Sequence, residues 1–101
     1  MSYNEVLAAR VKSVLKRRKG YMERKMFGGI CFMLNGHMTS GVVKDDLMVR
    51  VGADGYEAAL KLSHARPMDF TGRPLKGIIF VSPKGYATAA SLNRWISRAV
   101  T

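Results

Sequence analysis

The chain has 101 residues, a single cysteine and a formal net charge of +10, which suits one domain with one hydrophobic core. No apolar run approaches the roughly 18 residues of a membrane-spanning helix, and the first residues lack the layout of a signal peptide. Because Cys31 is alone, no internal disulfide can form. We therefore expect a cytoplasmic protein that does not contact membranes, folded as one domain over residues 1–101.

The first expected helix carries much of the positive charge. Ser2 and Glu5 have the spacing of a capping box, and Gly20 is expected to end the helix. Eight of the 17 basic residues lie between Arg10 and Lys25, against one acid. The apolar positions recur at helical spacing: Tyr3, Leu7, Val11, Val14 and Leu15. This pattern predicts a helix with a buried stripe and a basic exterior.

Residues 21–51 predict an antiparallel meander. The segment 30–34 is apolar at every position, as in a strand covered on both faces. Asn35-Gly36 is the strongest short hairpin signal, with partner strands expected at 37–43 and 47–51. Gly28-Gly29 allows a bend or a close approach of two backbones, because neither residue has a Cβ. The segment 21–25 is a candidate extension of the sheet.

The second half predicts a helix, two strands and a final helix. Asp54 is expected to cap a short helix over 55–61. A very short strand at 68–70 and a buried strand at 77–81 follow, and Thr88 is expected to cap the last helix. The buried side of that helix is expected to hold Ala89, Leu92, Trp95, Ile96 and Ala99. The order helix, three strands, helix, two strands, helix predicts a two-layer α+β domain with its helices on one face of the sheet.

Few groups suit catalysis or metal binding. His37 lies beside the hairpin turn and His64 lies in a loop, and a single histidine in such places is usually a solvated side chain. Cys31 fits a small hydrophobe in a strand better than a reactive thiol. These residues and Asp69 lack metal-ligand spacing, and the sequence contains no nucleophile elbow, Walker loop or dinucleotide fingerprint. We therefore expect a protein that is not an enzyme and that holds no cofactor or metal.

The segment 66–77 is the first candidate binding region. Arg66, Arg73 and Lys76 could converge on an acidic group of a protein partner, with Asp69 holding one guanidinium in place. The alternative is a rigid crossover in which Asp69 and an arginine pair to satisfy buried polar atoms. Prolines and glycines suit both interpretations.

The first helix is the second candidate binding region. Its basic residues, Lys12, Lys16, Arg17, Arg18 and Lys19, could lie along a phosphate backbone and bind nucleic acid without sequence preference. The alternative is a solvated helix face in a basic protein. No known DNA-reading motif is present.

Methionines are frequent in or beside the expected strands. They are Met26, Met33, Met38, Met48 and Met68. Methionine fills irregular cores and also lines adaptable binding surfaces. Because the helices are expected on one face only, we expect a second copy of the chain to cover some apolar surface of the open face or edge, giving a homodimer.

Several blocks, in order, resemble the TfoX N-terminal domain family, called after a regulator of natural competence also known as Sxy. They are Lys25-Met26-Phe27-Gly28-Gly29, Phe32, Asn35-Gly36 with Met38, Leu47-Met48-Val49-Arg50-Val51-Gly52, Arg66-Pro67-Met68-Asp69-Phe70-Thr71-Gly72-Arg73-Pro74-Leu75-Lys76-Gly77, and Arg94-Trp95. The resemblance runs from about Tyr3 to Val100. One block alone would be weak evidence, whereas the conjunction is specific.

The resemblance implies a fold like that of the type III secretion chaperones. It also implies a link to transcription control, because the full-length competence regulator acts together with the cyclic-AMP receptor protein. That regulator continues into a second domain, whereas this chain stops at Thr101, so we expect a stand-alone, single-domain member. The expected function is a non-catalytic interaction module that contacts a protein partner, with a transcription regulator as the candidate.

Overall fold

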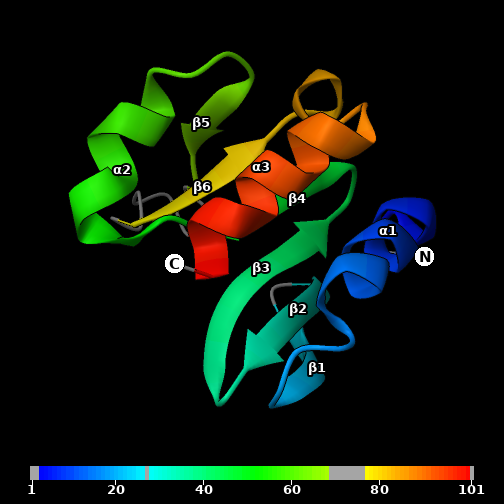
Figure 1. Ribbon diagram of the computed structural model, residues 1–101. Coiled ribbons are helices and arrows are strands. Elements are labelled where there is room, and N and C mark those ends of the chain that lie inside the picture. The colour runs from blue at the N-terminus through cyan, green and yellow to red at the C-terminus, as the bar shows by residue number, and fades with distance from the viewer. Residues whose placement is uncertain (1–2, 27, 69–76, 101) are drawn as a thin grey trace.

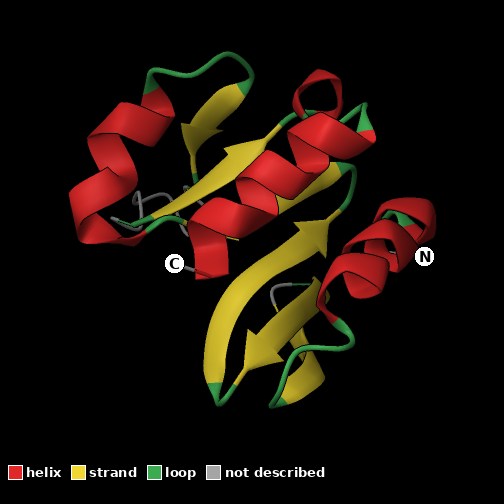
Figure 2. Ribbon diagram, viewed as in Figure 1, coloured by secondary structure: helices red, strands yellow, loops and turns green. Residues whose placement is uncertain are grey.

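The chain builds a six-stranded antiparallel sheet, in the order β1-β2-β3-β4-β6-β5, and lays its helices against one face of it (Figures 1 and 2). The computed structural model describes residues 3–26, 28–68 and 77–100. The elements are α1 (Glu5–Leu15), β1 (Tyr21–Met26), β2 (Gly29–Leu34), β3 (His37–Val43), β4 (Asp46–Arg50), α2 (Gly52–Leu60), β5 (Ala65–Pro67), β6 (Ile78–Val81), the 3₁₀ turn η1 (Pro83–Gly85) and α3 (Ala89–Val100). The predicted α+β class is confirmed.

Four strands precede α2, so the expectation of three strands there was wrong. The candidate extension at 21–25 is a full strand, β1, paired with β2 from Tyr21 opposite Leu34 to Met26 opposite Gly29. Its sequence lacks apolar alternation because β1 is an edge strand, and edge strands often carry charged residues that discourage pairing with other chains. Glu23, Arg24 and Lys25 have this character.

The short strand in the second half lies three residues earlier than expected. It is β5, Ala65–Pro67, and it pairs with the segment Ile79–Val81 of β6. Pro67 is tolerated because β5 is an edge strand, where a missing N–H costs no ladder bond. Met68 is fully buried but follows the strand, and the rest of the expected strand, residues 69–70, lies outside the described residues.

The ends of two helices differ from the sequence prediction. Asn4 caps α1, its side-chain oxygen accepting from the Leu7 N–H at 3.0 Å, and α1 ends at Leu15 rather than at Gly20. The helix α2 begins at Gly52 after Val51, which makes no side-chain cap bond, so Asp54 lies in its first turn and does not cap it. An acidic residue there interacts favourably with the helix dipole instead.

The predicted cap of α3 is confirmed. The Thr88 hydroxyl oxygen accepts from the Ser91 backbone N–H at 3.1 Å, which satisfies one of the free donors at the start of the helix. Leu92, Trp95 and Ile96 are buried against the sheet. Ala89, expected on the buried side, is exposed in the first turn.

The strand β2 is buried on both of its faces, as predicted. Phe32 is 1% exposed and faces the helices, whereas its neighbour Cys31 is 0% exposed and belongs to a separate cluster with Met48, Met68 and Phe80. We call the helix-covered side the first face and the side holding Cys31 the second face. Burial raises the pKa of the Cys31 thiol to about 11.

The Gly28-Gly29 pair provides both the bend and the close backbone approach that the sequence suggested. Gly28 has a φ of +73°, a left-handed conformation that costs other residues energy, with open space where a Cβ would point. A Cβ on Gly29 would lie 2.0 Å from the backbone oxygen of Val42. Gly29 therefore lets β2 and β3 meet where β2 begins.

Replacing each of these glycines by alanine should separate the two effects. Gly28→Ala should cost roughly 1–2 kcal/mol of unfolding free energy, the penalty for a left-handed L-residue. Gly29→Ala forces the new Cβ against the backbone oxygen of Val42, which cannot move freely, and should cost about 3 kcal/mol or more. Urea denaturation checks this, and equal midpoints for the two variants would contradict the close approach.

The burial of Cys31 predicts an unreactive thiol. The thiolate is the reactive form, and a raised pKa together with full burial leaves very little of it accessible near pH 8. A thiol reagent should label the native protein slowly at this pH and label one thiol per chain promptly in denaturant. Rapid, complete labelling of the native protein would contradict the assigned position of Cys31.

Candidate polyanion-binding surface

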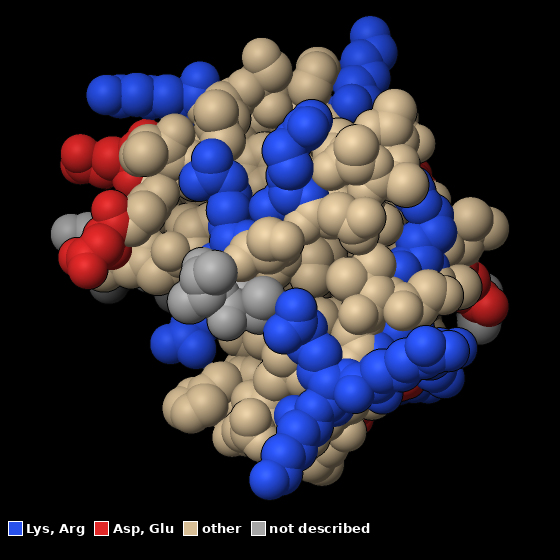
Figure 3. Space-filling view, in the orientation of Figure 1, with Lys and Arg blue, Asp and Glu red and all other residues tan. Residues whose placement is uncertain are grey.

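Four consecutive cations follow α1. Lys16, Arg17, Arg18 and Lys19, which we call the basic segment, are all exposed. The turn is held by its backbone, with Lys16 N–H donating to the Lys12 oxygen at 2.8 Å and Arg18 N–H donating to the Leu15 oxygen at 2.9 Å. Figure 3 shows Lys and Arg side chains gathered over the lower part of this view, around the end of α1 and the loop after it. None of the four forms an ion pair with a described residue.

Two other cations of α1 are engaged by the protein itself. Lys12, the fifth residue predicted to contact nucleic acid, lies 3.5 Å from Glu23 of β1. Glu23 also accepts a hydrogen bond from the Tyr21 hydroxyl at 2.6 Å. The pKa of Tyr21 is raised well above its usual value, chiefly by burial and further by the hydrogen bond and the charge of Glu23. Arg10 donates to the Tyr86 backbone oxygen at 2.8 Å and lies over the Tyr86 ring. Both cations therefore tie α1 to neighbouring elements.

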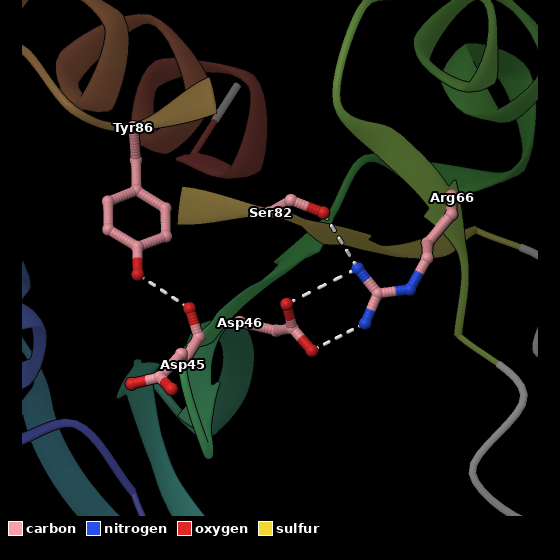
Figure 4. A network of polar contacts seen from close by, with 5 residues as sticks. All are labelled: Asp45, Asp46, Arg66, Ser82 and Tyr86. Carbon is pink, nitrogen blue, oxygen red and sulfur yellow. Dashed lines mark hydrogen bonds and ion pairs between the residues drawn. The ribbon is translucent and has the colours of Figure 1, made fainter. Parts of the chain in front are cut away.

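Arg66, from the other candidate region, is held in place by several contacts (Figure 4). Both of its terminal nitrogens donate to the Asp46 carboxylate, and one also donates to the Ser82 hydroxyl at 3.0 Å. Its guanidinium lies 5.1 Å from the centre of the Phe80 ring. Beside this pair, the Tyr86 hydroxyl donates a hydrogen bond to the backbone oxygen of Asp45 at 2.5 Å.

The partner of Arg66 is thus Asp46, and its contacts fix β5 to β4 and β6. Such a forked guanidinium–carboxylate pair is geometrically specific, which favours a structural role for Arg66. The other residues of the predicted protein-binding site, Asp69, Arg73 and Lys76, lie outside the described residues. Their predicted convergence stays a prediction.

A hollow of about 610 Å³ opens beside the basic segment. Arg18 and Lys19 line it from the loop after α1, His37 from the start of β3 and Arg50 from the end of β4. Asn35 and Thr39 add polar groups, while Leu34 and Ala99 add apolar surface, and the described residues that line the hollow include no carboxylate side chain. We call this the basic hollow.

Sequence reasoning placed Arg18 and Lys19 in a binding region but missed Arg50 and His37. The Asn35-Gly36 signal correctly put His37 beside a tight turn, with both turn residues at positive φ. Nothing local marks Arg50, because it reaches the hollow only through the pairing of β3 with β4. The residues that line the hollow come from both ends of the sequence.

A second hollow, of about 440 Å³, lies on the other side of α3. Lys84, Arg94 and Arg98 line it together with His64 and Trp95. The Arg98 guanidinium lies 5.7 Å from the centre of the Trp95 ring, and the Trp95 ring N–H donates to the Gly85 oxygen at 3.1 Å. Arg98 and Trp95 already make contacts within the protein, so the basic hollow is the better candidate for an external anion.

Within residues 3–26, 28–68 and 77–100, no cluster of three or more His, Cys, Asp or Glu residues could hold a metal ion. His37 begins β3, and His64 lies in the loop before β5. The described helices also include none with the length and apolar character needed to cross a membrane.

One comparison with known proteins gave a family match. The sequence model of the TfoX N-terminal domain matches residues 13–101, which include the basic segment, the sheet, α2 and α3. Neither the curated proteins nor the solved structures gave a match. The TfoX N-terminal domain is associated with the regulation of competence and DNA uptake. Because the match covers nearly the whole length, the chain belongs to the TfoX N-terminal domain family.

Proposed function

We propose that this protein is a non-catalytic interaction module of transcription control of the competence type, working in the cytoplasm, and that it contacts the phosphate backbone of nucleic acid. The basic segment carries this proposal. Its four side chains are exposed and form no ion pairs with described residues. A net charge of +10 adds long-range attraction for a polyanion.

The comparison with Arg66 supports the choice of surface. Arg66 is committed to Asp46 and Ser82, so recruiting it for a partner would break contacts inside the domain. The basic segment can neutralise phosphates without such a loss. Backbone contacts of this kind position a protein on nucleic acid but carry no base specificity.

A titration with duplex DNA at two salt concentrations tests the proposal. Each phosphate contact adds about 0.9 to the slope of log affinity against log salt, so binding should weaken steeply between about 50 and 200 mM salt. The double variant Lys16→Gln/Arg17→Gln should lower the slope by about 1–2.

The matched control is Lys44→Gln/Lys61→Gln, which removes the same charge from two exposed lysines outside the basic segment. It should keep most of the slope. Absence of binding at low salt, or equal slopes for the two double variants, would remove the proposed surface.

A second candidate function, contact with a second copy of the chain, is favoured by a row of methionines. Met22, Met33 and Met38 are neighbours across β1, β2 and β3, and Met22 is 55% exposed. They lie toward the second face, whereas the basic hollow includes Leu34 and Ala99 of the first face. Methionine suits adaptable protein contacts because it is flexible and polarisable.

Light scattering at rising concentration tests self-association. The wild type should approach the mass of a dimer, and Met22→Glu should remain a monomer because it buries a charge in the contact. Leu62→Glu, which alters another exposed apolar side chain, should behave as the wild type. A wild type that remains monomeric at the highest concentration would exclude the homodimer.

A further inference from the structure

The basic hollow has a rim fixed by a close contact between two turns. Gly20, after the basic segment, has a φ of +81°, and its carbonyl oxygen accepts from the Asn35 N–H at 3.1 Å. A Cβ on Gly20 would lie 2.2 Å from the Asn35 side-chain oxygen and 2.7 Å from its backbone nitrogen. The loop that carries Arg18 and Lys19 is thereby held against the hairpin that carries His37.

A bulge in β3 places Thr39 in the wall of the hollow. Phe32 of β2 pairs with Ser40, but Met33 pairs with Met38, so Thr39 is an extra residue in β3. The Thr39 hydroxyl donates to the Phe32 oxygen at 3.0 Å, and Thr39 is only 5% exposed. Bulges redirect side chains and bend the strand, and this one puts a buried hydroxyl among the residues that line the hollow.

No described residue balances the positive charges of the hollow. Arg18, Lys19 and Arg50 are exposed and make no ion pair with a described residue. Elsewhere, Lys12 and Arg66 have carboxylate partners. Like charges gathered at one place repel one another, and an anion bound among them relieves that repulsion while accepting hydrogen bonds from the two guanidinium groups.

We infer that the basic hollow is a discrete binding site for a phosphate group carried by a ligand of about nucleotide size, with Arg18 and Arg50 as its principal ligands. The volume of about 610 Å³ falls within the range of small-molecule sites. The apolar surface of Leu34 and Ala99 can accept the non-phosphate part of the ligand. This inference rests on the proposed phosphate contact and deepens it, since it assigns one phosphate to a specific position.

Calorimetry with inorganic pyrophosphate and adenosine 5′-monophosphate tests the site at low salt. Both should bind the wild type, and adenosine, which has no phosphate, should not. Arg50→Gln should weaken binding about tenfold or more, the effect of losing one charged hydrogen-bond donor. Arg24→Gln removes the same charge from an exposed residue of β1 that does not line the hollow, and it should change affinity by less than about twofold.

Arg18→Gln provides a second variant, in a loop rather than a strand, and should weaken binding as Arg50→Gln does. Circular dichroism confirms that each variant is folded. Absence of pyrophosphate binding by the wild type, or equal losses for the Arg24 and Arg50 variants, would overturn the inference.

Competition with duplex DNA that lacks terminal phosphates separates the two sources of phosphate. If the duplex displaces pyrophosphate, the hollow takes a backbone phosphate; if only the mononucleotide displaces it, the hollow serves a small ligand. If only the inferred phosphate site is wrong, DNA binding should remain salt-dependent, and its affinity should be the same for Arg50→Gln and the wild type. Failure of the proposed function alone would leave pyrophosphate binding without any binding to duplex DNA.

Discussion

Phe32 and Cys31 are neighbours in β2, point to opposite faces of the sheet and are both almost completely withdrawn from water. Burial of large apolar side chains such as Phe32 stabilises a fold by roughly 1.5–3 kcal/mol each, so this strand commits both faces of the central sheet to apolar residues. Charged side chains can therefore lie only on the outer helix surfaces, in the turns, on the edge strand and at the strand ends. A chain with 17 basic residues must therefore carry them around its margin.

That margin contains two kinds of cation. Arg66 and Lys12 pair with carboxylates, and Arg10 donates to a backbone oxygen. All three connect one element to another, and those joined by Arg66 and Arg10 are distant in sequence. Arg18, Lys19 and Arg50 connect nothing within the described residues. With only 7 acidic residues against 17 basic ones, carboxylates are too few to neutralise every cation. What distinguishes the basic hollow is that its unpaired cations lie together rather than scattered.

The sequence revealed the elements whose signals are local. Apolar residues at every position of 30–34, the Asn35-Gly36 turn and the Thr88 cap each depend on the chemistry of a few adjacent residues, and each matched the structure. The strand β1 was underestimated because an edge strand needs little apolar alternation. The start of α1 was misassigned to Ser2 because Asn4, two residues later, caps equally well.

The candidate site was only half predictable for a related reason. Arg18 and Lys19 belong to an evident run of charge, but their neighbours in the hollow are set by the strand order and by the contact between Gly20 and Asn35. A hairpin signal says that His37 is next to a turn and does not say which loop that turn meets. Arg50 is one more exposed arginine until the pairing of β3 and β4 carries it to the same place.

The two candidate contacts occupy different faces, and this has an energetic consequence. Self-association through Met22, Met33 and Met38 brings together two chains of net charge +10 each, and that repulsion opposes the apolar gain. A polyanion bound at the basic segment and hollow lowers the repulsion without covering the methionines. Nucleic-acid binding and dimerisation would then be thermodynamically coupled, each raising the affinity of the other by the same factor, and the coupling would weaken as salt screens the charges.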